Sequence, residues 1–457
     1  MSMHVRSPGR VVCMARVACA ASFLLVLICS KNCSAYSLLT HEQIVDIAWK
    51  DDIVPVLLAR FPGATEAQLR DAHAFAYGGC LIQDIGYYPF GHKYFSDLTH
   101  YVRSGDFVAS LIRESSDLNQ YAFAFGSLAH YSSDNSGHPL VNRAVALNFP
   151  HLRAKYGEVV TYEKNPTAHI RVEFGFDMAQ VAKGRYTSEN YHAFIGFAVS
   201  KPVLERAVMD TYGLTLTESL GPEDLAIGTF RRSVSQLIPA LTKVALAERR
   251  PELIKEYPNF SEKRFLYNLS RSEYEREWGR DYRKPGAVAK VIAWLIRWIP
   301  KVGPLKGLHF VNPTPETEDL YFKSVNRTVE TYKSLLKKVA AGDLDIPDLD
   351  CDTGNPAAAH EYGLSDETYA RLLDQHAKRG LTTVAPDLRT NILAFYRHAY
   401  TPPTKSRKAR DAWCKTVMEL RMLYGIQNEP GYAGTHTNEF TVEPPVPVHI
   451  KAGAHGH

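Results

Sequence analysis

The chain has 457 residues, of which 45% are hydrophobic and 22% are charged. This length can bury a large core in one big domain or in two to three ordinary ones, and the composition excludes a disordered chain. The formal net charge is +4 at pH 7, but residues 1–35 hold basic side chains and no acidic ones. Removing them leaves equal numbers of each sign, so the remainder has no global field for collecting a polyanion such as nucleic acid.

The first 35 residues have the order of a secretory signal peptide: a basic start, a short apolar run over residues 17–29 and small residues before Ala35-Tyr36. The apolar run is too short for a comfortable membrane span, although an uncleaved anchor is the alternative. We therefore expect cleavage near Ala35-Tyr36 and a secreted or periplasmic mature protein.

Three cysteines lie beyond this segment, at Cys80, Cys351 and Cys414. Their number is odd and their spacing is not that of a disulfide framework. One disulfide between two of them remains open, but the fold cannot depend on a disulfide scaffold.

Helical periodicity of apolar residues dominates the chain and strand alternation is scarce, which predicts an all-α protein. Residues 41–59 follow this pattern, with Pro55 as a break or a new start. Residues 66–83 and 117–134 follow it too, and Asp117 is suited to cap the latter helix. Between them, the Gly-, Tyr-, Phe- and Pro-rich stretch 84–99 is expected to be a loop at the rim of a cleft.

Further helices are expected within residues 186–280, 317–340 and 366–425. Residues 286–308 combine Trp and Ile with Lys and Arg, which suits either an interfacial membrane element or a packed helix with a basic edge. From Pro430 onwards the chain is expected to be extended or disordered.

Two pairs of histidine and carboxylate occur at a spacing of four residues, His130 with Asp134 and His169 with Glu173. An α-helix places such residues on one face, one turn apart, so each pair aims a nitrogen and an oxygen at one point. Zinc binds these ligand types at about 2.0–2.2 Å. Each residue alone could equally be a cap, a packed side chain or half of a surface pair; their clustering favours a metal site.

Four stretches carry a resemblance to a known family. GGCLIQDIGYYP supplies Asp84, FSDLTHYVRSGDF supplies His100, FGSLAHYSSDNSGHPL supplies His130, and HIRVEF supplies His169. Together they resemble the zinc-dependent phospholipase C family and the related single-strand-specific zinc nucleases. The short spacing from Asp134 to the next histidine looks most like the N-terminal domain of glycosylphosphatidylinositol-specific phospholipase D.

The resemblance covers roughly residues 36–180 and implies an all-helical bundle with about three zinc ions. One ion would be held by Asp84, His100 and His130, with Asp134 bridging to a second. The second would be chelated by His41 and by the free amine and carbonyl of Tyr36, which stands where the family usually has Trp. The third would be held by His138, His169 and Glu173. His92 competes with His100 for the first site, and the local sequence favours His100.

The reaction implied is hydrolysis of a phosphodiester by an activated water, with Asp84 able to accept a proton as well as to bind metal. We interpret the protein as a secreted zinc-dependent phospholipase C acting on phospholipid headgroups. Aromatic residues of the 84–99 stretch could line a headgroup pocket or serve only as hydrophobic anchors: Tyr87, Tyr88, Phe90, Tyr94 and Phe95. A single-strand-specific nuclease is the alternative, and an inactive zinc-binding interaction protein is a further one.

The domain organisation expected is a signal peptide over 1–35, a catalytic domain over 36–245, a helical extension packed on the core over 246–430 and a tail over 431–457. The expected partner is a phospholipid or membrane surface, nucleic acid is less expected, and no stable protein partner is predicted.

Overall fold

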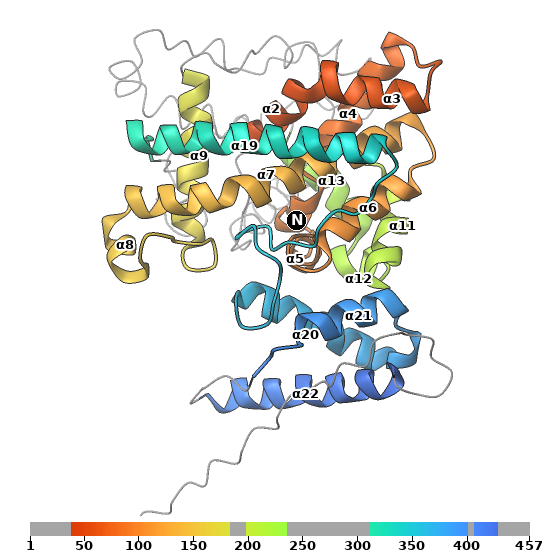
Figure 1. The fold of residues 1–457 in the computed structure, drawn as a ribbon, viewed down its shortest axis with the longest axis vertical. Coiled ribbons are helices and arrows are strands. Elements are labelled where there is room, and N and C mark those ends of the chain that lie inside the picture. The colour runs from red at the N-terminus through yellow and green to blue at the C-terminus, as the bar shows by residue number, and fades with distance from the viewer. Residues whose placement is uncertain (1–37, 183–197, 235–310, 401–405, 428–457) are drawn as a thin grey trace, which may run out of the picture.

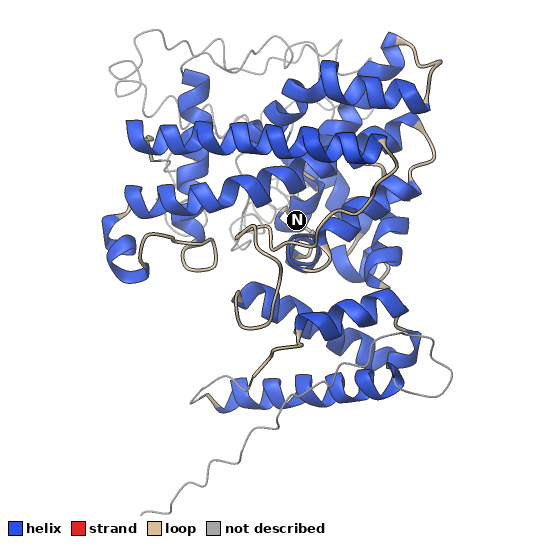
Figure 2. Ribbon diagram, in the orientation of Figure 1, coloured by secondary structure: helices blue, strands red, loops and turns tan. Residues whose placement is uncertain are grey.

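The structure is a computed structural model that describes residues 38–182, 198–234, 311–400 and 406–427. Figure 2 shows helices throughout this part of the chain and no strand. Extended backbone pairs within it at an isolated bridge between Leu349 and Pro356. The predicted fold class, an all-α multi-helix bundle with a further helical region towards the C-terminus, is confirmed.

The backbone stays helical through the position of Pro55, from Leu38 to Arg60. The proline lies in the first turn of its helix, where its missing N–H leaves no hydrogen bond unmade. The expected new start at Pro55 is therefore observed, and a π-helical turn joins it to the helix before. The elements here are α2 (Leu38–Ala48), η1 (Trp49–Ile53), α3 (Val54–Arg60), α4 (Glu66–Gly79), η2 (Ile82–Tyr87), α5 (Lys93–Tyr101) and α6 (Ser104–Glu114).

The stretch 84–99 is not the loop that its composition predicts. It contains the end of the 3₁₀ helix η2 and most of α5, and only residues 88–92 join the two. Its apolar residues recur at helical spacing: Tyr94, Phe95 and Leu98 bury one face of α5 in the core. Burial of that face outweighs the loop-like content of Gly and Pro.

The helix α7 (Leu118–Asn148) forms the centre of the molecule, and Asp117 caps it as predicted by accepting a hydrogen bond from the Gln120 backbone N–H at 2.8 Å. Its buried positions extend around the whole helix for most of its length, because neighbours cover it on several sides. Against α4 the two backbones approach closely at small residues. A Cβ built on Gly126 would lie 1.9 Å from the Ala76 carbonyl oxygen, and one on Gly79 would lie 1.9 Å from that of Phe123.

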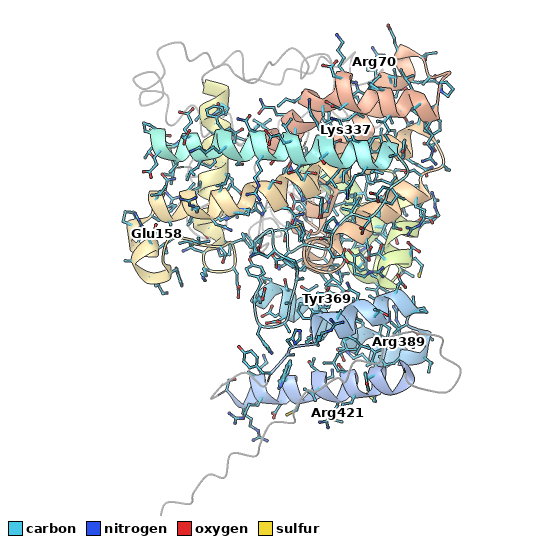
Figure 3. The ribbon with its side chains drawn as sticks, viewed as in Figure 1. Arg70, Glu158, Lys337, Tyr369, Arg389 and Arg421 are labelled. Carbon is cyan, nitrogen blue, oxygen red and sulfur yellow. The ribbon has the colours of Figure 1, made fainter. Side chains whose placement is uncertain are left out.

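The C-terminal region packs on this bundle. Figure 1 shows α19 (Pro315–Ala340) lying along α7, where the Tyr332 hydroxyl donates to the Phe125 carbonyl at 2.9 Å. Figure 1 shows α20 (Gly363–Arg379) and α21 (Pro386–Phe395) below it. Tyr369 of α20, labelled in Figure 3, stacks on Phe395 of α21 with ring centroids 3.7 Å apart. The remaining elements are α8 (Pro150–Tyr156), α9 (Pro166–Ala182), α11 (Lys201–Tyr212), α12 (Leu216–Leu220), α13 (Glu223–Arg232), η6 (Leu381–Thr383) and α22 (Arg407–Gln427).

Several sequence-based expectations lie outside the described residues, namely the signal peptide, the basic aromatic stretch 286–308 and the tail after residue 430. The domain boundaries at 245 and 430 remain predictions. Cys80, Cys351 and Cys414 are free thiols, so none of them forms a disulfide. Within the described ranges, no helix is long and apolar enough to cross a membrane.

The contact of α4 with α7 gives a stability prediction. Gly126→Ala forces a methyl group into the Ala76 carbonyl, so we expect the free energy of unfolding to fall by about 1–3 kcal/mol, as for other overpacked cores. Gly228→Ala on α13 is the matched control, because a Cβ there meets nothing within 4 Å. Urea denaturation should show the control unchanged or stabilised by about 0.5–1 kcal/mol. Equal stability of the two variants would show that the helices are not in this close contact.

Candidate metal centre

The helix α7 supplies three of the predicted site residues from one face. His130, Asp134 and His138 follow one another at intervals of four residues, so each lies one helical turn beyond the last. All three are buried, with at most 4% of the residue exposed. A buried face of alternating imidazole and carboxylate is unusual in a helix that otherwise packs apolar residues.

Four other elements bring the remaining predicted residues to this face. The chain places His41 on α2, Asp84 on η2, His100 on α5 and both His169 and Glu173 on α9. The side chains form three groups, and within each group one ligand atom from every residue lies within 4.8 Å of the others. The groups are His41 with His130 and Asp134; Asp84 with His100 and His130; and His138 with His169 and Glu173. We call this set the His–carboxylate cluster. Tyr36 lies outside the described residues.

Asp134 joins the groups because its two carboxylate oxygens face different histidines. Oδ2 lies 3.2 Å from His100 Nε2 and 3.2 Å from His130 Nε2. Oδ1 lies 3.7 Å from His41 Nε2 and 3.6 Å from His138 Nε2. This division between the two oxygens is the geometry that a bridging carboxylate needs.

The third group lies at the end of the cluster formed by α7 and α9. Glu173 Oε1 lies 2.9 Å from His169 Nε2 and 3.4 Å from His138 Nε2. The two imidazole rings meet edge to face, with centroids 5.1 Å apart. Three donor atoms from two helices therefore converge on one point.

Backbone carbonyl oxygens lie beside the Nδ1 atoms of three of the histidines. The distances are 2.6 Å from His100 Nδ1 to the Ser96 oxygen, 2.9 Å from His130 Nδ1 to the Cys80 oxygen and 3.1 Å from His138 Nδ1 to the Cys351 oxygen. A carbonyl only accepts, so each contact places the ring proton on Nδ1. The Nε2 lone pair then faces the cluster, which is the arrangement of a metal-binding histidine.

The electrostatics of the cluster favour added positive charge. Burial by itself would raise the pKa of the Asp134 carboxyl, but His130 and His138 outweigh it, so this pKa lies well below its usual value. Burial would likewise lower the pKa of His138, but Asp134 and two other carboxylates outweigh it and raise this pKa well above its usual value. At His41, burial and the neighbouring His130 instead lower the pKa, which favours the neutral imidazole that a metal ion binds.

The carboxylates fit a metal ion better than they fit their protein surroundings. Asp84, Asp134 and Glu173 are buried, and neither oxygen of any of them accepts a hydrogen bond. Their ion-pair partners among the described residues are histidines, with no lysine or arginine. Buried carboxylates left this way cost several kcal/mol unless a cation compensates them. The donor set of imidazole nitrogens and carboxylate oxygens suits zinc.

The structure shows which of the two competing histidines, His92 or His100, lies in the cluster. His100 is buried in the cluster, whereas His92 is exposed at the start of α5, beside Gly221. Of the aromatic residues considered for a headgroup pocket, Tyr94 and Phe95 are core residues, and Phe90 is 37% exposed. The centroid of the Tyr87 ring lies 6.2 Å from that of His100, so Tyr87 adjoins the cluster.

Two further carboxylates near the cluster were not found from the sequence. Asp177 accepts hydrogen bonds from the Leu39 backbone N–H at 3.0 Å and the Thr40 hydroxyl at 2.6 Å, and so holds the start of α2 beside α9. Its spacing of four residues from Glu173 was the available signal. Asp352 lies 3.2 Å from His138 Nδ1, and nothing in its local sequence indicates that contact.

These features define a class: an all-α protein with a buried, multinuclear site of histidine and carboxylate ligands. Residues 40–220 match the family model described as zinc dependent phospholipase C. The resemblance seen in the sequence is thereby confirmed, and it supports a zinc phospholipase C-like hydrolase. No curated protein and no solved structure matches the chain significantly.

Proposed function

We propose that the protein is a secreted zinc-dependent phosphodiester hydrolase of the phospholipase C type. The observation that carries the proposal is the convergence of three ligand groups around the two oxygens of Asp134, within a stretch that matches the zinc-dependent family. Secretion rests on the signal-like segment 1–35, whose cleavage would also free the amine of Tyr36.

The proposal gives each group of residues in the cluster a role. Asp84, His100 and His130 would hold one zinc ion. His41 would hold a second, together with the amine and carbonyl of Tyr36. The third would be held by His138, His169 and Glu173. Asp134 would bridge the first two. Closely spaced zinc ions lower the pKa of water and stabilise charge on a phosphoryl group.

The chain's own residues would do the remaining work. The carbonyl contacts at Nδ1 fix the ring orientation of His100, His130 and His138, so the ligands need little rearrangement on binding. Asp84 is the candidate to accept a proton from the attacking water, because neither of its oxygens is engaged by a hydrogen-bond donor.

The family match favours a phospholipid as the substrate. The balance of charge after residue 35 agrees with it, because single-strand-specific nucleases need a basic track for phosphates. The nuclease remains the second candidate, since aromatic side chains such as Tyr87 adjoin the cluster. A binding protein without catalysis would not need three groups of buried metal-ligand side chains.

A parallel assay with a phosphatidylcholine dispersion, single-stranded DNA and a chromogenic phosphodiester separates these functions. We expect hydrolysis of the phospholipid, little of the DNA, and loss of both in the presence of a zinc chelator. Asp134→Asn should lower turnover by more than about 100-fold, because disturbing even the outer partners of metal ligands costs about 10–100-fold.

The matched control is Asp117→Asn, at the exposed cap of the same helix, where asparagine caps as well as aspartate. It should retain full activity, and circular dichroism should show both variants folded. Full activity in Asp134→Asn would remove the bridging role, whereas faster cleavage of DNA than of lipid would favour the nuclease.

The role of the N-terminus gives a separate prediction. Asp177 holds the chain at Leu39 and Thr40 beside the cluster. A free amine at Tyr36 would therefore be tethered a few residues from a fixed position, and it could bind the same zinc ion as His41. Protein beginning at Tyr36 should therefore bind one more zinc ion than protein carrying a few extra residues before it. Elemental analysis of both forms measures this, and equal zinc content would exclude the amine as a ligand.

A further inference from the structure

A segment outside the family match reaches the His–carboxylate cluster. Residues 344–356, here called the strap, connect α19 to α20 and contain no helix. The Cys351 N–H donates to the His100 carbonyl at 3.0 Å, and the Cys351 carbonyl lies 3.1 Å from His138 Nδ1. The strap thus contacts two of the predicted zinc ligands, although the match ends at residue 220.

Asp352 adds a charged side-chain contact between the strap and the cluster. Its Oδ1 lies 3.2 Å from His138 Nδ1. Its Oδ2 accepts hydrogen bonds from the hydroxyls of Tyr101 at 2.9 Å and Tyr362 at 2.5 Å. Its backbone carbonyl accepts from Asn142 Nδ2 at 2.9 Å. The residue is 3% exposed. Three side chains contact its carboxylate and a fourth bonds to its backbone, so the carboxylate is held in one place.

The strap packs closely against α7. Gly354 adopts φ +70°, and a Cβ there would lie 2.5 Å from the Asn135 carbonyl oxygen. Pro139 lacks the N–H that would normally bond to that carbonyl within the helix. The strap therefore approaches α7 at a turn where the backbone leaves room for it, directly beside His138.

We propose that Asp352 is a positioning residue of the zinc centre, which fixes the orientation and the Nδ1 proton of His138 so that Nε2 faces the metal. The proposal rests on the proposed function, because it concerns the same site. It makes the centre a joint product of the matched stretch and of a segment that follows it by more than a hundred residues.

The chemistry explains why a carboxylate stands here when the Cys351 carbonyl already lies within reach of Nδ1. A negative acceptor makes the imidazole a stronger ligand than a neutral one does, since it stabilises the positive charge that the ring gains on binding a metal. The two tyrosine hydroxyls leave Oδ1 as the oxygen that faces the histidine. The structure places Asp352 against Nδ1 of His138, whereas the Nδ1 contacts described above for His100 and His130 are with backbone carbonyls.

The test is a zinc titration of metal-free full-length protein against a chromophoric chelator, with cobalt(II) absorption as a second readout of ligand geometry. In Asp352→Asn, the isosteric amide keeps the packing but loses the charge. We expect one zinc ion to bind about 10–100-fold more weakly, with the remaining ions unaffected and an altered cobalt spectrum. Tyr362→Phe, which removes one donor to Asp352, should show a smaller loss at the same ion.

The matched control is Asp350→Asn, two residues away in the same strap. Asp350 Oδ1 accepts from the backbone N–H groups of Asp352 and Thr353, and its Oδ2 accepts from the Ser365 hydroxyl. An asparagine keeps an oxygen that can accept the two backbone hydrogen bonds and removes the charge, so Asp350→Asn should leave Asp352 in place and bind zinc like the wild type. Wild-type affinity and an unchanged cobalt spectrum in Asp352→Asn would overturn the positioning role while leaving the proposed function intact. Equal weakening in both variants would also overturn it, because the strap would then act only through its folding. A wild-type chain that binds no zinc would refute the proposed function itself.

Discussion

The structure depends on the compensation of charge in a buried cluster. Asp84, Asp134 and Glu173 lie in the interior, accept no hydrogen bonds, and have histidines as their ion-pair partners among the described residues. Burial of such groups is costly unless cations or protons balance them. Five elements contribute side chains to this cluster, so the compensating charge would also tie α2, η2, α5, α7 and α9 together. Binding of zinc and stability of the fold are on this view the same physical event, because a site formed only in the folded chain stabilises that chain.

Much of this arrangement could be predicted from residues close together in sequence. The spacing of His130, Asp134 and His138 requires only a helix to bring them together, and the cap at Asp117 marks where that helix begins. The composition of residues 84–99 was a poorer guide, because burial of Tyr94 and Phe95 decides the conformation there and is a tertiary effect. Asp352 could not be found at all from its neighbours, since the strap meets His138 across a separation of 213 residues. A single sequence contains no record of such a contact.

The region after the family match takes part in the site as well as in the core. The long helix α19 packs along α7, which carries three of the predicted ligands, and the Tyr332 hydroxyl donates a hydrogen bond to the backbone of α7. Figure 1 shows the chain leading from α19 to α20. On this path the strap contacts the His100 carbonyl and the His138 ring. This extension does more than cover the bundle. The backbone of its Cys351 contacts the His100 carbonyl and the His138 ring, and the carboxylate of its Asp352 contacts the His138 ring.

The most direct measurement is anomalous X-ray diffraction at the zinc absorption edge from crystals of protein that begins at Tyr36. Three peaks are expected: one among Asp84, His100 and His130, one beside His41, and one among His138, His169 and Glu173, with Asp134 between the first two. A cluster without zinc peaks in crystals grown with excess zinc, or zinc bound only at surface histidines such as His92, would contradict the metal centre.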